Sequence, residues 1–96
     1  MGQLEEIKQK LVKLKPELVE KFSVQSLGLF GSVVREDFSS SSDIDIIVEF
    51  NKPIGIEFFE LADLIEEKLQ KAVDLVSRKG IKPKYFEAIE PEIIYV

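Results

Sequence analysis

Residues 31–45 read GSVVREDFSSSSDID: a glycine and a serine, then ten residues, then two aspartates that flank one isoleucine. One apolar run, residues 24–30, precedes this stretch. A second, residues 43–48, begins within its last three residues and continues beyond it. Short apolar runs bounded by glycine and serine are typical of buried strands. We therefore expect two strands here, joined by a tight turn at Gly31 and a serine-rich loop.

The two aspartates of the second strand predict a metal site. Side chains alternate between the faces of a strand, so Asp43 and Asp45 project from one face, about 6.5–7 Å apart along the chain. Like charges this close raise each other's pKa, and a divalent cation removes that penalty. Carboxylate oxygens are the ligands that magnesium and manganese prefer.

A third aspartate, Asp74, lies inside another apolar run, residues 72–76, where a charge needs a partner or a task. If this strand lies beside residues 43–48, Asp74 joins the pair. Three carboxylates are enough for a two-metal site acting on a phosphoryl group. Asp74 could instead accept the proton of an attacking hydroxyl, and the sequence leaves both roles open.

The glycine and serine suit the phosphate end of a nucleotide. Gly31 lets backbone approach a ligand closely, and Ser32 can offer its hydroxyl and amide to phosphate oxygens at the start of a helix. Alternatively, the two residues form a plain turn and a helix N-cap, the aspartates face solvent, and Asp74 pairs with a lysine. The combination of Gly31-Ser32, the two strand aspartates and the later Asp74 favours the metal and phosphate interpretation.

The pattern along the whole chain predicts one small α/β domain over residues 1–96. It has a small mixed sheet flanked by helices, and the sequence leaves the direction of the strands open. Apolar residues at three- and four-residue steps predict helices. Pro16 should end the first of them. The expected elements are a helix over residues 4–14 with one more turn at 17–22, helices over 56–69 and 83–88, and an edge strand or packed tail over 92–96.

The composition excludes several classes of function. The chain has no cysteine and no histidine, which removes thiolate nucleophiles, Ser-His-Asp schemes and the usual zinc ligand sets. A net charge of −5 disfavours non-specific nucleic-acid binding. No signal peptide or membrane-spanning run is visible, so we expect a cytoplasmic protein without a membrane partner. Self-association stays open.

The segment from residue 27 to 76 resembles the DNA polymerase β-like nucleotidyltransferases, whose signature is Gly-Ser, a spacer, Asp-x-Asp and a later third aspartate. In its small size, in Leu-Phe-Gly-Ser at residues 29–32 and in Ser-Asp-Ile-Asp-Ile at residues 42–46, it is similar to the stand-alone minimal nucleotidyltransferases of prokaryotes. Members of that branch are often antitoxins paired with a HEPN-domain ribonuclease toxin.

This resemblance implies transfer of AMP from ATP to a hydroxyl, commonly a tyrosine of the partner, with magnesium, expected as two ions. It implies that Gly31 and Ser32 hold the triphosphate and that Arg35 touches phosphate. Asp43 and Asp45 would hold metal, with Asp74 as the third carboxylate and base. One departure is Glu36, where many relatives have a glycine.

A second function belongs to another class: a non-catalytic binding module that neutralises a partner toxin by direct contact. The departure at Glu36 and the lack of the extra domain of larger relatives favour it. The intact Gly-Ser and the three aspartates favour the enzyme, because a purely structural inhibitor has no need of like charges gathered on one face.

Overall fold

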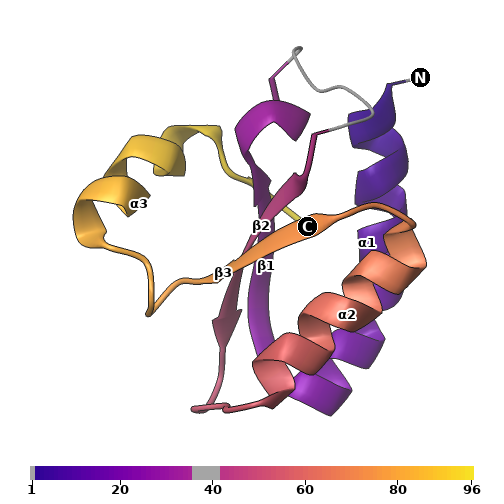
Figure 1. Ribbon diagram of the computed structural model, residues 1–96, viewed down its shortest axis with the longest axis vertical. Helices are drawn as coiled ribbons and strands as arrows, with labels where there is room; N and C mark the ends of the chain where they lie inside the picture. Colours follow the sequence, from indigo (N-terminus) through magenta and orange to yellow (C-terminus); the bar gives the residue numbers. More distant parts are fainter. Residues whose placement is uncertain (1, 36–41) are drawn as a thin grey trace.

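Four strands form a mixed sheet in the order β3-β2-β1-β4 (Figure 1). The strands are β1 (Val24–Phe30), β2 (Ile44–Phe50), β3 (Val73–Ser77) and β4 (Ile94–Tyr95) in a computed structural model that describes residues 2–35 and 42–96. β1 is antiparallel to β2 and β4, whereas β3 is parallel to β2. The parallel pair brings the first residues of β2 and β3 to the same edge of the sheet, and these strands contain the aspartates.

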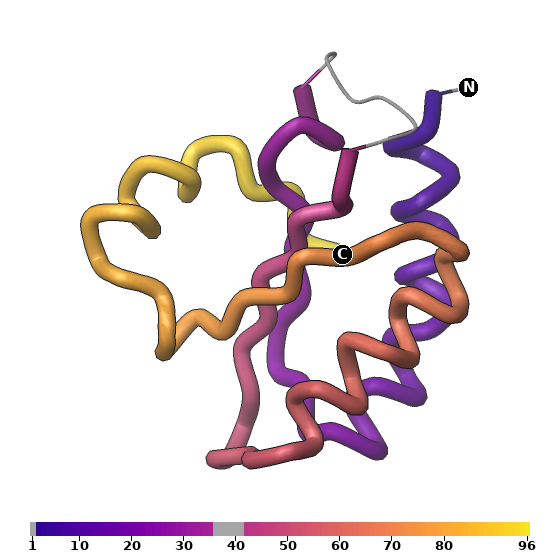
Figure 2. The backbone as a smooth tube through the Cα atoms, in the orientation of Figure 1, coloured from indigo at the N-terminus to yellow at the C-terminus, as the bar shows by residue number. Residues whose placement is uncertain are grey.

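Two long helices, α1 (Gln3–Phe22) and α2 (Glu57–Leu69), cover one face of the sheet together (Figures 1 and 2). Their apolar stripes meet alternate residues of the three longer strands in the main core. Burying one such leucine or isoleucine is worth about 1.5–3 kcal/mol. Fully buried members include Leu11, Leu18, Leu27, Ile44, Ile46, Leu61 and Ile65.

A smaller core lies on the opposite face, under α3 (Pro83–Ile89) and the 3₁₀ turn η2 (Glu90–Glu92). Phe30, Ile47 and Ile89 form its buried centre. The Arg78 guanidinium lies 3.6 Å from the centre of the Phe86 ring, which fastens α3 to the end of β3. Because Ile47 packs here, Asp45, two residues earlier on β2, projects from this same face.

The first helix is longer than the sequence predicted, because α1 continues through Pro16 without interruption. Proline has no N–H to donate to the carbonyl of residue 12, yet the helix is continuous at this point. The buried Leu11, Leu14 and Leu18 continue the apolar stripe past the proline. Packing of that stripe outweighs the local preference.

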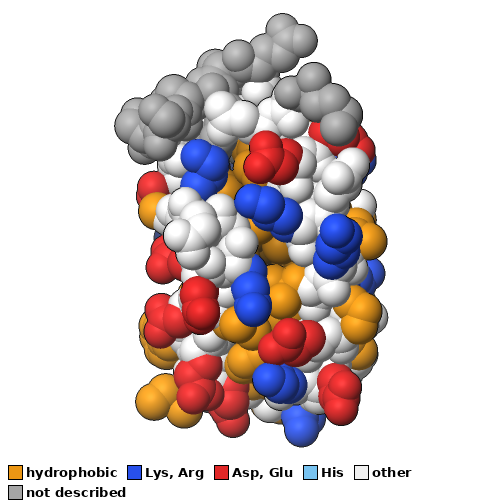
Figure 3. All heavy atoms as spheres, turned by 90° about the vertical axis from the view of Figure 1, so that its right-hand side faces the viewer, with side chains coloured by type: hydrophobic (Ala, Val, Ile, Leu, Met, Phe, Trp, Pro, Cys, Tyr) orange, Lys and Arg blue, Asp and Glu red, His pale blue; other side chains and the backbone are white. Residues whose placement is uncertain are grey.

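The outer surface of α1 and α2 carries charges of both signs, intermixed over a hydrophobic background (Figure 3). Lys10 and Glu6 lie 3.5 Å apart, and Lys21 and Glu17 3.1 Å, each pair one helical turn apart. Exposed pairs of this kind stabilise a helix by about 0.3–0.5 kcal/mol. Within the described ranges, no helix is both long and apolar enough to cross a membrane.

Candidate active site

Asp45 of β2 and Asp74 of β3 are direct neighbours across the parallel strand pair. Asp45 is half-buried between β1 and β3, whereas Asp74 is exposed on the edge strand. The expectation that the third apolar run lies beside the second is thus met, and this pairing brings Asp74 beside Asp45. Two carboxylates at adjacent positions of one sheet face make a concentrated negative site.

The electrostatics of Asp45 reflect that arrangement. Burial, followed by the negative charges of Asp74 and Asp43, raises the pKa of Asp45 from 3.8 to about 6, and the positive charge of Arg35 opposes the rise. A hydrogen bond between the Asp45 and Asp74 carboxyls adds to it. A bound cation would relieve the repulsion between these neighbouring carboxylates.

Gly31 fits the backbone against Asp45. It follows β1 directly, begins the 3₁₀ turn η1 (Gly31–Val33) and has a φ of +78°. A β-carbon on Gly31 would overlap Oδ2 of Asp45. The tight turn expected after β1 is present, but the helix expected to begin there is only one turn of 3₁₀ helix, so Ser32, half-buried within it, has no long helix dipole behind it.

Arg35 and the Gly31 amide share an unexpected partner, Glu92. The Gly31 N–H donates to Oε1 of Glu92 at 3.2 Å, and Nη1 of Arg35 donates to Oε2 at 2.9 Å. Glu92 ends η2, just before β4, so the fold brings it back from a distant part of the chain. Sequence reasoning missed it, because a glutamate near the end of a chain carries no local signal of such contact.

Asp43 differs from Asp45 and Asp74 because it does not lie on a strand. β2 begins at Ile44, so Asp43 precedes the strand on which it was expected, and it is exposed. Among residues 2–35 and 42–96, no three His, Cys, Asp or Glu side chains gather into a group that could hold a metal. Asp43 is nevertheless near enough to raise the pKa of Asp45.

The donor set suits magnesium, which is usually held by one or two carboxylates together with substrate phosphates and water rather than by a complete protein cage. The adjacent Asp45 and Asp74 supply the carboxylates, and their mutual repulsion favours a cation. Glu36 and most of the serine run, which sequence analysis singled out as a departure and a linker, lie outside the described residues.

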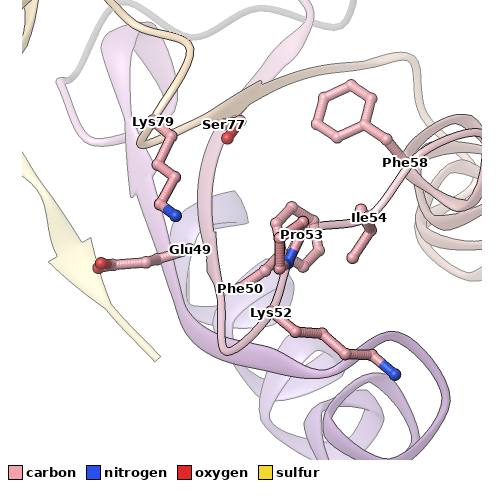
Figure 4. Close-up of a pocket in the computed structure, with 8 residues that line it drawn as sticks. All are labelled: Glu49, Phe50, Lys52, Pro53, Ile54, Phe58, Ser77 and Lys79. Carbon is pink, nitrogen blue, oxygen red and sulfur yellow. The ribbon is translucent and has the colours of Figure 1, made fainter.

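A separate pocket of about 290 Å³ lies at the other end of β2 and β3 (Figure 4). Glu49 and Ser77 line it from the strands, Lys79 from just beyond β3, and Phe58 from α2. Glu49 is four residues past Asp45 on β2, a separation of about 13 Å along the strand. The pocket is therefore distinct from the aspartate site.

Residues 11–96 match the nucleotidyltransferase domain family, and the chain belongs to that family. A "putative protein adenylyltransferase" of Methanocaldococcus jannaschii is 44% identical over the full length of both chains. The protein adenylyltransferase MntA of Thermococcus cleftensis is 39% identical, over 97% of this chain and 95% of its own.

Solved structures support the same fold. A "putative minimal nucleotidyltransferase" superposes with a TM-score of 0.82 at 26% identity, over 97% of this chain and 95% of that one. A chain of a toxin-antitoxin complex with AMP-PNP superposes with a TM-score of 0.76 at 27% identity, over 92% of this chain and 70% of that one. The mixed-sheet nucleotidyltransferase fold expected from the sequence is thereby confirmed.

Proposed function

We propose that this chain is a single minimal nucleotidyltransferase domain that transfers AMP from ATP to a tyrosine hydroxyl of a HEPN-domain toxin, and so acts as its antitoxin. The observation that carries the proposal is the adjacent pair Asp45 and Asp74, one half-buried and one exposed. Without a cation, the repulsion between the two carboxylates raises the free energy of the folded state. A purely structural surface has no reason to retain such an unfavourable pair.

The reaction is a displacement at the α-phosphorus of ATP. The tyrosine oxygen attacks, a bond to the α-phosphorus forms, and the bond from that phosphorus to the oxygen bridging to the β-phosphate breaks, so pyrophosphate leaves. The tyrosine proton passes to a carboxylate. We assign that role to Asp74, because it is exposed on the edge strand where a hydroxyl of another protein can reach it.

The remaining site residues hold the nucleotide. The Gly31 amide and the Arg35 guanidinium are donors at the end of β1, and Ser32 adds a hydroxyl, which together suit phosphate oxygens. Asp43 and Asp45, with Asp74, would hold magnesium, for which we propose two ions. Bound magnesium supplies charge neutralisation at the transferring phosphoryl group.

The relatives support the donor and the acceptor. MntA of Thermococcus cleftensis is named a protein adenylyltransferase, and the toxin-antitoxin structure contains AMP-PNP, an ATP analogue. This chain matches that MntA over 95% of the relative's length, so the likeness covers nearly the whole of the relative. Dependence on ATP and the absence of cysteine support a cytoplasmic location.

The proposal is tested by incubating the protein with ATP, magnesium and a HEPN-domain protein from the same organism, and then measuring the intact mass of that candidate partner. A gain of one or more AMP units, absent with Asp45→Asn and present with Asp63→Asn, is expected. Asp63 is the matched control because it is an exposed aspartate on α2. A partner that binds tightly and gains no mass would instead establish the binding module.

A further inference from the structure

The carboxylate of Glu92 already occupies the donors at the phosphate end of the site. Each of its two oxygens accepts one hydrogen bond, Oε1 from the Gly31 amide at 3.2 Å and Oε2 from Arg35 at 2.9 Å. The Glu92 side chain is 27% exposed and that of Arg35 55% exposed, so solvent and a ligand can reach this contact.

A phosphate group and a carboxylate make equivalent demands on such donors. Both present two oxygens to a backbone N–H and an arginine fork, and both are favoured there by charge. The Gly31 N–H is a single donor that already points at Glu92, so a phosphate oxygen taking the same hydrogen bond would have to replace the carboxylate. The structure thus holds an internal anion where an external one would bind.

Charge opposes the presence of both anions at once. Asp45 and Asp74 are direct neighbours across β2 and β3, so two carboxylates already lie at this edge of the sheet. A triphosphate beside an unmoved Glu92 would add like charges with one arginine between them, which is unfavourable. Displacement of Glu92 leaves the triphosphate as the only anion bound to the Gly31 amide and Arg35.

The backbone around Glu92 allows its side chain to leave without a rearrangement of the fold. The Ile93 N–H donates to the Glu90 carbonyl at 3.2 Å, and the Val96 N–H donates to the Leu27 carbonyl of β1 at 2.9 Å. Nζ of Lys15 donates to the Val96 carbonyl at 2.7 Å, which fastens the end of the chain to α1. Only rotation of the glutamate side chain is required, a nanosecond event.

We propose that Glu92 is an internal competitor that sets nucleotide affinity: its carboxylate rests on the Gly31 amide and Arg35 in the free protein, and the triphosphate of ATP binds by displacing it. The inference rests on the proposed function for the identity of the incoming anion. It assigns to Glu92 a role in affinity and none in the chemical step.

The test compares the Kd for ATP with magnesium, without acceptor protein, in wild type and Glu92→Gln by calorimetry. The glutamine keeps the shape of the side chain and removes its charge, so it competes less well, and the Kd should fall about two- to fivefold, the range that a partly exposed ion pair supports. Glu90→Gln, an exposed glutamate of the same turn, should leave the Kd within about twofold.

A second measurement follows the ¹³C resonance of the Glu92 carboxyl during titration of wild type with ATP. It should move at saturation while that of Glu90 stays in place. An unchanged or higher Kd for Glu92→Gln would show that Glu92 instead holds Arg35 in position, and an equal gain with Glu90→Gln would reduce the effect to overall charge. Either result overturns the inference and leaves the proposed function standing, whereas absence of ATP binding by wild type and both variants overturns the two together.

Discussion

The backbone of Gly31 and the carboxylate of Asp45 are fitted to each other: φ at Gly31 is +78°, and a β-carbon there would overlap Oδ2 of Asp45. The glycine follows β1, and Asp45 lies on the neighbouring β2, opposite Phe30 in the register of the two strands. Gly31 of the Gly-Ser turn and Asp45 are therefore one structural unit.

Gly31→Ala should damage both stability and activity. The alanine is strained at this φ, by about 1–2 kcal/mol, and its β-carbon also displaces the Asp45 carboxylate from its position. Urea unfolding should show a lower midpoint with an unchanged m value. Gly80→Ala is the control, because its β-carbon would have only ordinary contacts at 3.8 Å and should leave both properties nearly unchanged.

The stability of the metal-free protein should fall as the pH rises from about 4 to about 6. Asp45 holds its proton more tightly in the folded protein, where its pKa is about 6, than in the unfolded chain, where the pKa is 3.8. Loss of that proton as the pH rises therefore favours the unfolded chain. Asp45→Asn stays neutral, removes this pH dependence, and should be more stable than wild type at pH 7.5 by about 1 kcal/mol after solvent screening is discounted.

Urea unfolding at several pH values in the presence of a chelator measures this effect as the difference between wild type and Asp45→Asn. The same variant should be inactive, so a gain in stability accompanies a loss of function. Asp63→Asn, on the exposed surface of α2, should follow the wild-type curve. An Asp45→Asn protein less stable than wild type at pH 7.5 would show that burial and the neighbouring carboxylates do not make a charged Asp45 unfavourable in the fold.

Magnesium with ATP should stabilise wild type against heat. A ligand at about 100 times its Kd adds about 2.7 kcal/mol, which corresponds to a rise in Tm of roughly 10–20 °C for a domain of this size. Asp74→Asn should show less than half of that rise, because it removes one of the two adjacent carboxylates. Equal shifts in wild type and variant would place the magnesium away from Asp74.

Pro16→Ala should stabilise the protein by about 1–2 kcal/mol. The alanine restores an N–H that can donate to the Val12 carbonyl within α1, offset in part by the greater freedom of the unfolded chain. Urea unfolding measures the change, with Lys13→Ala as a control on the exposed side of the same helix. A loss of stability would mean that Pro16 contributes packing that its exposed position does not show.

Local patterns predicted most of the fold, because apolar periodicity and short apolar runs reflect burial directly. They placed β1 over residues 24–30, α2 within residues 56–69 and the start of α3 at Pro83. They failed at Pro16, where the apolar stripe on both sides of the proline outweighs its local preference, and at Asp43, which precedes its strand. Packing across the molecule decides such positions.

The site was predictable in part for the same reason. The alternation of side chains along a strand indicated Asp45, and its place as an isolated charge in an apolar run indicated Asp74. The register of β2 and β3 brings these two residues together. Glu92 was not predictable, because it meets Gly31 and Arg35 only through the pairing of β4 with β1. Contacts between distant segments leave no local pattern in a single sequence.

Adenylyl transfer at Asp45 and Asp74 is tested most directly with ATP that carries the label either at the α- or at the γ-phosphate. The labelled ATP is incubated with the protein, magnesium and the proposed HEPN-domain partner, and the label retained on that partner is measured. We expect α-label on the partner with wild type, none from γ-labelled ATP, and none from either with Asp74→Asn. Retention of γ-label, or α-label undiminished in Asp74→Asn, would contradict that expectation.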